Sequence, residues 1–431
     1  MQRPPFVVAI EMGYGHLRAA KPLADRLGTE LLECDREPLA DPVEQRKWVA
    51  TRRAYEGTSR LSQLPFVGAP LRRALEVMTA IPELHPYRDL SAPTIGTRIL
   101  AHFIERGLGR GLAERMKSEG RSLLTTFFAP AIAAEHHGAT DIYCVVTDAD
   151  INRAWAPLLS RSTRIRYFVP SIRAQRRLAS YGVPEDRITY TGFPFPHELL
   201  GGPGLDVLKG NLARRIARLD PTRAFRAQLR DELEHVLGPI PDVGGPARLC
   251  FAVGGAGAQV ELVQRFLPGM AGAIRAGRLA LTLVAGVRPE VSAKFMDAIS
   301  SCGLEVEFES GKIEIIEAPT MAAYLRLFHA RLADVDVLWS KPSELTFFAA
   351  LGLPLVFCPP IGVHEEYNRR WAVEAGAGLR QGAPALAAEW LDDWLSDGTL
   401  AGAAWSGFQR LPKAGLYRIL DQIERSRRAG S

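Results

Sequence analysis

Two strand, glycine turn and helix patterns, one in each half of the chain, constrain its fold more than any other feature. The first is the apolar run 6–10, followed by Gly13-Tyr-Gly15 and a segment with apolar residues at helical spacing. The second is the run 249–253, followed by Gly254-Gly-Ala-Gly257 and a similar segment. A strand that passes through a tight glycine turn into a helix is typical of doubly wound α/β domains. The sequence therefore predicts two such domains.

Further apolar runs alternate with helical stretches in both halves. Strands are expected at residues 142–146, 165–169 and 188–191, and then at 279–285, 313–317, 335–339 and 354–358. This alternation predicts parallel sheets with helices on their faces. The fold class is therefore α/β, with two Rossmann-like domains facing each other across a cleft. Helical spacing broken by prolines at about residues 40–117 indicates a helical insertion in the first domain.

Composition changes at Gly201-Gly-Pro-Gly204, which marks the expected domain boundary. We predict an N-terminal domain over residues 1–200 and a C-terminal domain over 205–400, which opens with an arginine-rich helix at 205–237. Residues 401–431 are expected to form a C-terminal helix that packs back on the N-terminal domain.

Length and composition exclude several classes of protein. The 431 residues, 47% of them apolar and 23% charged, are about three times a typical domain of roughly 150 residues. Each apolar run is shorter than the roughly 20 residues that a transmembrane helix needs. The first run ends at Glu11 and is too short for the core of a signal peptide. We therefore expect a cytoplasmic protein without membrane-spanning segments.

Cysteine usage and charge distribution add two expectations. The five cysteines form no Cys-x-x-Cys pair, and Cys144, Cys250 and Cys358 lie in apolar runs, which predicts buried, reduced thiols. Residues 151–230 hold fifteen Lys and Arg against five Asp and Glu, so this segment has a net charge of +10. The rest of the chain has a net charge of −5, which gives +5 in total. The segment 151–230 suits an anionic partner such as a phosphate group or an anionic membrane surface. The alternative is a set of solvated helix faces that are rich in arginine.

The first glycine loop places His16 at the start of a helix. A helix N-terminus presents unpaired N–H groups and a positive partial charge, which favours an anion and a neutral imidazole. Such a histidine can act as a general base near pH 7. The alternative is a glycine turn in which His16 only caps the helix.

Asp148 follows the predicted strand 142–146, and ligands of open α/β sheets bind at the carboxyl ends of strands. The Asp148-x-Asp150 spacing invites a metal site, but no third ligand accompanies it, so no metal is expected. The consecutive residues His136 and His137 do not share a helix face, which makes a metal site there improbable.

Three loops of the second half gather further polar groups. Gly254, Gly255 and Gly257 allow backbone N–H groups to approach a phosphate, but they lack the Gly-x-Gly-x-x-Gly spacing of a dinucleotide site, so no cofactor is expected. In the second loop Ser343 and Glu344 are expected to stabilise the start of a helix, a role compatible with ligand contact. The third loop is polar and includes His364, Glu365 and Asn368.

In their order, these segments resemble the two-domain GT-B glycosyltransferases, in particular the monogalactosyldiacylglycerol synthases and the peptidoglycan N-acetylglucosaminyltransferase. Four segments carry the resemblance: Gly13-Tyr-Gly15-His16; Val145-Val-Thr-Asp148 with Asn152 and Trp155; residues 167–194; and the region from Asp336-Val-Leu-Trp-Ser-Lys341 through Gly352-Leu-Pro354 and Glu365-x-x-Asn368 to Gly376-Ala-Gly378. Together they extend over about residues 6–380.

The resemblance implies an inverting, metal-independent transfer of a sugar from a UDP-sugar to a lipid or other hydrophobic acceptor, and no nucleic-acid partner. It implies that His16 or Asp148 is the base, and that Gly13, Gly15, Asn152 and Trp155 lie on the acceptor side. The donor would be bound by Gly254, Gly255, Gly257, Lys341, Ser343, Glu344, Thr346, His364, Glu365 and Asn368. A peripheral position at the inner face of the membrane would fit a lipid acceptor.

Three positions depart from the pattern of that family. Phe347 stands where a Glu usually holds the donor ribose, Asn152 stands where the synthases have His, and His364 replaces a usual Gln. Two alternatives therefore stay open: a non-catalytic protein that binds nucleotide sugars, and a nucleotide-sugar epimerase.

Overall fold

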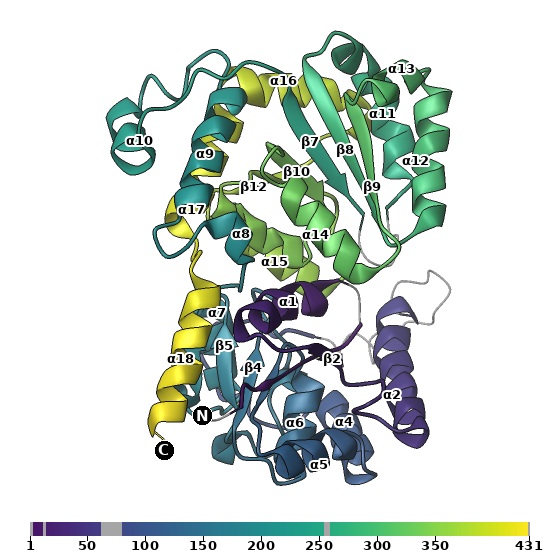
Figure 1. Ribbon diagram of the computed structural model, residues 1–431, viewed down its shortest axis with the longest axis vertical. Coiled ribbons are helices and arrows are strands. Elements are labelled where there is room, and N and C mark those ends of the chain that lie inside the picture. Colours follow the sequence, from purple (N-terminus) through teal and green to yellow (C-terminus); the bar gives the residue numbers. More distant parts are fainter. Residues whose placement is uncertain (1–2, 12–13, 62–79, 254–258, 430–431) are drawn as a thin grey trace. The chain divides into compact units, whose positions relative to one another are not determined.

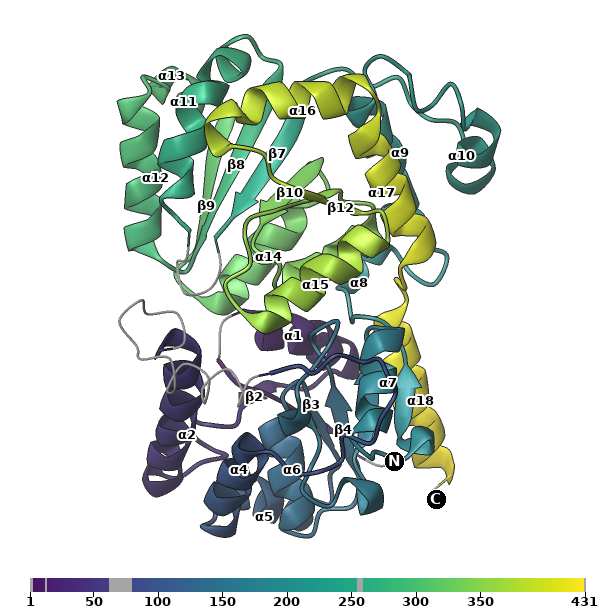
Figure 2. The same cartoon turned by 180° about the vertical axis from the view of Figure 1, so that it is seen from behind.

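The computed structural model describes residues 3–11, 14–61, 80–253 and 259–429 (Figures 1 and 2). The chain divides into two compact units. Unit 1 comprises Met1–Phe195, Ile361–Asn368 and Ala414–Ser431, and unit 2 comprises Pro196–Pro360 and Arg369–Lys413.

Unit 1 is built on a parallel six-stranded sheet with the order β2-β1-β3-β4-β5-β6. Its strands are β1 (Phe6–Ala9), β2 (Leu31–Glu33), β3 (Leu123–Thr125), β4 (Ile142–Val145), β5 (Arg166–Val169) and β6 (Ile188–Tyr190). The strands predicted at β1, β4, β5 and β6 are confirmed. The helices of this unit are α1 (Gly15–Leu27), α2 (Pro42–Leu61), α4 (Ile95–Glu105), α5 (Arg110–Glu119), α6 (Phe128–His136), α7 (Ile172–Ser180) and α18 (Gly415–Ala429).

Unit 2 carries a second parallel six-stranded sheet, with the order β12-β11-β10-β7-β8-β9. Its strands are β7 (Ala247–Ala252), β8 (Leu279–Gly286), β9 (Ile313–Glu317), β10 (Val337–Ser340), β11 (Leu355–Phe357) and β12 (Gly378–Arg380). When β7 is numbered as the first strand and the sheet is read from β9 to β12, the strand order is 3-2-1-4-5-6. This is the strand order of the Rossmann fold. The predicted α/β class with two Rossmann-like domains is confirmed.

The helices of unit 2 surround this sheet. They are α8 (His197–Leu200), α9 (Asp206–Leu219), α10 (Arg230–Leu237), α11 (Leu262–Arg275), α12 (Pro289–Ser301), α13 (Glu305–Glu309), α14 (Met321–Arg331), α16 (Ala387–Ser396) and α17 (Thr399–Arg410), with the 3₁₀ helix η4 at Glu344–Leu351. Helix α15 (Val363–Glu374) begins in unit 1 and ends in unit 2.

Two helix predictions were wrong in extent. The expected helix at 205–237 is interrupted after α9, because Asp220 accepts the backbone N–H groups of Phe225 and Arg226 in a turn and Pro221 cannot continue a helix. The expected helix at 401–431 is likewise two helices. Residues 401–413, with α17, lie in unit 2, and only α18 lies in unit 1.

Buried side chains hold the helical stretch at 40–117 together and join it to the loop after β4. The Glu44 carboxylate accepts the backbone N–H of Gly109 at 2.7 Å and that of Gly111 at 3.2 Å, at the start of α5. Burial raises the pKa of Glu44 in spite of these donors. The guanidinium of Arg153 donates to the carbonyl oxygen of Ser91 from Nε at 3.2 Å and from Nη2 at 2.9 Å. These bonds fix the loop after β4 to the segment that precedes α4.

Several arginines of the basic segment 151–230 are structural. Arg153, Arg177 and Arg215 are buried. The Arg215 guanidinium donates to four backbone carbonyl groups, those of Leu332, Val335, Leu351 and Gly352, at 2.8–3.2 Å. Burial lowers its pKa to about 10, so it stays charged at neutral pH. The surface of this segment therefore carries less charge than its sequence suggests.

The cysteines behave as the sequence predicts. All five are free thiols, and Cys144, Cys250 and Cys358 are buried. Burial raises the pKa of the Cys144 thiol far above its ordinary value, which makes it unreactive. Over the described ranges, none of the helices has the length and apolar character that crossing a membrane requires.

Candidate functional site

The topology of unit 1 defines where a ligand would bind. The chain goes from β1 to β2 on one side and returns to β3 on the other, so the strand order reverses between β1 and β3. In open α/β sheets, ligands bind outside the carboxyl ends of the strands at such a point. Helix α1, whose second residue is His16, comes after β1 there, and Thr126 and Phe127 follow β3.

His16 is held at this point by both of its neighbours after β3. Its Nδ1 lies 2.7 Å from the carbonyl oxygen of Thr126, and the Thr126 hydroxyl donates to the carbonyl of His16 at 3.0 Å. The imidazole also contacts the Phe127 ring edge to face, with centroids 4.9 Å apart. Because a carbonyl oxygen only accepts, Nδ1 must carry a proton. In the neutral ring the lone pair is therefore on Nε2, which is the atom able to accept a proton.

The loop after β4 brings Asp148 to the same edge of the sheet. The hydroxyl of the buried Thr147 lies 3.4 Å from His16 Nδ1, which joins this loop to the start of α1. Asp148, the next residue, is half-buried. The structure thus places His16 and the loop that bears Asp148 at one edge of the sheet.

Asn368 of α15 also belongs to this edge of unit 1. Its Oδ1 accepts the backbone N–H of Ala149 at 2.8 Å, and its Nδ2 donates to Asp148 Oδ1 at 3.1 Å. Glu365, which is also buried, accepts the backbone N–H of Ile361 at 2.8 Å and so closes the turn before α15. Both residues were predicted to bind the donor, yet these hydrogen bonds join them to unit 1 and to the start of their own helix. His364, which lies between this turn and Glu365, is exposed.

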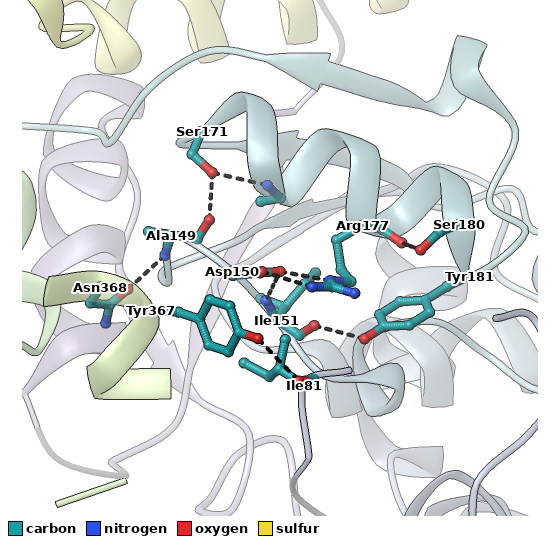
Figure 3. A network of polar contacts seen from close by, with 11 residues as sticks. Ile81, Ala149, Asp150, Ile151, Ser171, Arg177, Ser180, Tyr181, Tyr367 and Asn368 are labelled. Carbon is teal, nitrogen blue, oxygen red and sulfur yellow. Dashed lines mark hydrogen bonds and ion pairs between the residues drawn. The ribbon is translucent and has the colours of Figure 1, made fainter. Parts of the chain in front are cut away.

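A buried ion pair joins the loop to α7 (Figure 3). Asp150 accepts from Arg177 Nε at 2.8 Å and from Arg177 Nη2 at 2.9 Å, and both side chains are 0% exposed. Burial alone would lower the pKa of Arg177, but the hydrogen bonds to Asp150 outweigh it and raise that pKa. Asp150 is therefore a structural partner of α7. Among the residues that the structure describes, no three His, Cys, Asp or Glu are grouped as metal ligands.

The other residues predicted on the acceptor side have local structural roles. Asn152 accepts the backbone N–H of Ala154 at 3.0 Å and caps a short 3₁₀ helix, Arg153–Trp155. Trp155 is buried in the core against Phe128, with ring centroids 5.2 Å apart. Gly15 is the first residue of α1, whereas Gly13 lies outside the described residues. Contact of Asn152 or Trp155 with an acceptor stays a prediction.

In unit 2 the strand order reverses between the adjacent strands β7 and β10. Gly254, Gly255 and Gly257, which follow β7, lie outside the described residues. After β10 come Lys341, Ser343 and Glu344, all partly exposed, and then Thr346, which is fully buried. The expected helix start is a 3₁₀ helix, η4, and the Ser343 side chain makes no capping hydrogen bond there, because its backbone carbonyl accepts the N–H of Thr346 instead.

Phe347, which stands where the glycosyltransferases that the sequence resembles usually have a Glu, is a core residue of unit 2. Its side chain is 2% exposed and packs on Trp371, with ring centroids 5.2 Å apart. The position therefore belongs to the core of unit 2. The nearest acidic side chain before Phe347 in the sequence is that of Glu344, in the first turn of η4, and it is partly exposed.

Comparisons with known proteins show the fold. No protein-family model and no curated protein matches the sequence. MnaA from S. aureus, in a co-structure with UDP, aligns with a TM-score of 0.52 and 14% identity over 99% of this chain and 97% of that chain. A protein from Listeria monocytogenes assigned as a UDP-N-acetylglucosamine 2-epimerase also reaches 0.52 and 14% identity, over 97% of this chain and 95% of its own. MurG from Acinetobacter baumannii aligns at 0.48 and 14% identity, over 98% and 99%.

The chain shares with MnaA and the Listeria monocytogenes protein the two-domain α/β architecture of the GT-B type. At 14% identity the likeness concerns the fold alone.

Proposed function

We propose that this protein is an inverting, metal-independent glycosyltransferase that moves a sugar from a UDP-sugar to a hydroxyl group of a lipid or other hydrophobic acceptor. The observation that carries the proposal is the imidazole of His16, held with Nδ1 on the Thr126 carbonyl at the strand reversal of unit 1, beside the loop that bears Asp148. The UDP bound to a protein of the same fold supports the choice of donor.

The proposed chemistry assigns a task to each unit. In unit 1, His16 Nε2 or the Asp148 carboxylate takes the proton of the acceptor hydroxyl as its oxygen bonds to the anomeric carbon. The bond from that carbon to the β-phosphate oxygen breaks, and UDP leaves with the electron pair. In unit 2, the loops after β7 and β10, with Lys341, would offset the charge on the leaving diphosphate. The acceptor replaces the diphosphate on the opposite face of the sugar, which inverts the anomeric centre.

A second candidate is a UDP-sugar 2-epimerase, which the assignment of the Listeria monocytogenes structure favours. Calorimetry with UDP, followed by incubation with UDP-hexoses with and without glycolipid acceptors, separates the candidates. Transfer predicts UDP release that depends on the acceptor, whereas epimerisation predicts an isomeric UDP-sugar without an acceptor. Binding without turnover indicates a non-catalytic protein. Failure of UDP to bind at millimolar concentration would overturn the choice of donor.

We expect Glu344 to take over the ribose contact that Phe347 cannot make. Replacing Glu344 by alanine should weaken UDP binding by about 10-fold or more, because a hydrogen bond to a charged group is worth roughly 1.5–3 kcal/mol. Calorimetric titration with UDP measures the change, and Glu366→Ala, in the first turn of α15, is a control for the loss of one acidic charge. Unchanged affinity in Glu344→Ala would show that the ribose is held elsewhere.

A lipid acceptor would bring the protein to an anionic membrane surface. Arg164 and Arg176 of unit 1 are exposed, and each basic residue near such a surface contributes about 1 kcal/mol to binding. Reversing both to glutamate should lower co-sedimentation with phosphatidylserine vesicles by about 10-fold or more at low salt. Pelleting that neither salt nor the double reversal reduces would remove these arginines from a docking role.

A further inference from the structure

Both ends of the Asn368 amide form hydrogen bonds to the loop after β4. The side chain is 0% exposed, its Oδ1 accepts from the backbone of Ala149, and its Nδ2 donates to the Asp148 carboxylate. The sequence leads to a different expectation, since Asn368 belongs to a segment that resembles a donor-binding motif. An amide engaged at both ends with the loop of a candidate base is suited to orienting that base.

Helix α7 holds the following residues of the same loop (Figure 3). Ser171 donates from its hydroxyl to the carbonyl of Ala149 at 2.5 Å, so both backbone groups of Ala149 are engaged. Arg177 pairs with Asp150, and the Tyr181 hydroxyl donates to the carbonyl of Ile151 at 2.9 Å. Residues 149–151 are therefore fixed by α7, and the side chain of Asp148 at their beginning is oriented by Asn368.

The hydroxyl of the neighbouring Tyr367 strengthens this placement of α15. It donates to the carbonyl of Ile81 at 3.3 Å, and Arg173 of α7 lies 5.9 Å from the centre of its ring. Two consecutive residues of α15 are thus bound within unit 1. Asn368 is held close to Asp148 by more than its own hydrogen bonds.

We propose that Asn368 is a positioning residue that orients the Asp148 carboxylate for the acceptor, rather than a ligand of the sugar nucleotide. Its Nδ2 donates a hydrogen bond to Oδ1 of Asp148, and this bond directs the other oxygen of the carboxylate toward the acceptor hydroxyl. The role in turnover rests on the proposed function, whereas the orientation of the loop does not.

Two variants and a matched control test the role in turnover. Asn368→Ala removes both hydrogen bonds, and Asn368→Asp keeps an acceptor for Ala149 but sets a second carboxylate against Asp148 in place of the donor. Arg370→Ala, on an exposed turn of the same helix, is the control. Both Asn368 variants should lower kcat by about 10-fold or more and leave the UDP affinity within about 2-fold of the wild type. A donor ligand would give the opposite pattern, with weaker UDP binding and a nearly normal kcat.

A double-mutant cycle shows whether Asn368 acts through Asp148. If it does, adding Asn368→Ala to Asp148→Asn should lower kcat no further than Asp148→Asn alone. Full additivity of the two effects would overturn the proposal, since it would place Asn368 in a separate function.

Amide hydrogen exchange of the ligand-free protein provides a readout that needs no activity. Exchange in a peptide covering residues 146–152 should become faster in Asn368→Ala and stay unchanged in Arg370→Ala. Unchanged exchange in Asn368→Ala would overturn the proposal even if the wild type proved unable to release UDP. A wild type that releases no UDP, with faster exchange in Asn368→Ala, would refute the proposed function and leave the positioning of the loop supported.

Discussion

Replacing His16 by alanine should lower acceptor-dependent release of UDP by about 100-fold or more while leaving UDP affinity unchanged. The reason is the fixed orientation of the imidazole: Nδ1 is committed to the carbonyl of Thr126, so the proton-accepting nitrogen is Nε2. Alanine removes that atom without touching unit 2, where the donor is proposed to bind. Steady-state rates of UDP release and calorimetry on the same preparation measure the two quantities.

Two further variants complete this prediction. His102→Ala, which removes an exposed histidine of α4, is the control and should be as active as the wild type. Asp148→Asn keeps the size of the side chain and tests the second candidate base. If His16→Ala and Asp148→Asn both retain nearly normal rates, neither residue is the base, and the chemistry must be sought outside this edge of the sheet.

Breaking the ion pair of Arg177 and Asp150 should destabilise the protein by about 3–5 kcal/mol, the usual cost of leaving one charge of such a pair buried alone. Both side chains are 0% exposed, and Asp150 would lose both of its guanidinium donors in Arg177→Met. We expect a clear fall in the midpoint of thermal or urea unfolding. Arg176→Met, at the exposed neighbouring position of α7, should change the midpoint little.

The pair of charges can also be removed together. Combining Arg177→Met with Asp150→Leu replaces both with apolar groups and should recover much of the lost stability, because no charge is then left without a partner. A single Arg177→Met variant as stable as Arg176→Met would show that solvent or a rearranged side chain compensates Asp150. In that case the pair could not be the support of the loop after β4.

The sequence predicts most strands of the two sheets and misses β2, β3 and β12. Apolar runs such as β4 and β8 are recognisable because several buried residues follow one another. Strands β2 and β12 have three residues each, most of them not buried, so no apolar run marks them, and β3 is a run of only Leu123, Leu124 and Thr125. The helix expected at 205–237 has the right composition, but its interruption depends on Asp220, whose backbone contacts appear only in the folded chain.

For the candidate site, the sequence predicts the residues that directly follow long strands. His16 and Asp148 are found in this way, because the carboxyl ends of parallel strands share one edge of a sheet. Thr126 is missed because it follows β3, an unrecognised strand. The contact of Asn368 with Asp148 has no local signal, since the two residues lie far apart in the chain and only tertiary packing joins them. Arg177 was counted as surface charge because its partner Asp150 belongs to another element.

Arg215 has a consequence for which substitutions the chain tolerates. Its planar guanidinium donates hydrogen bonds to four buried carbonyl groups at the ends of α14 and η4, which would otherwise need water as their donor. Lysine has the same charge, but its three donors radiate from a single point and cannot span all four oxygens. A substitution that only retains the positive charge at this position therefore destabilises the fold. The four carbonyl groups need donors that are spread apart, as they are on a guanidinium group.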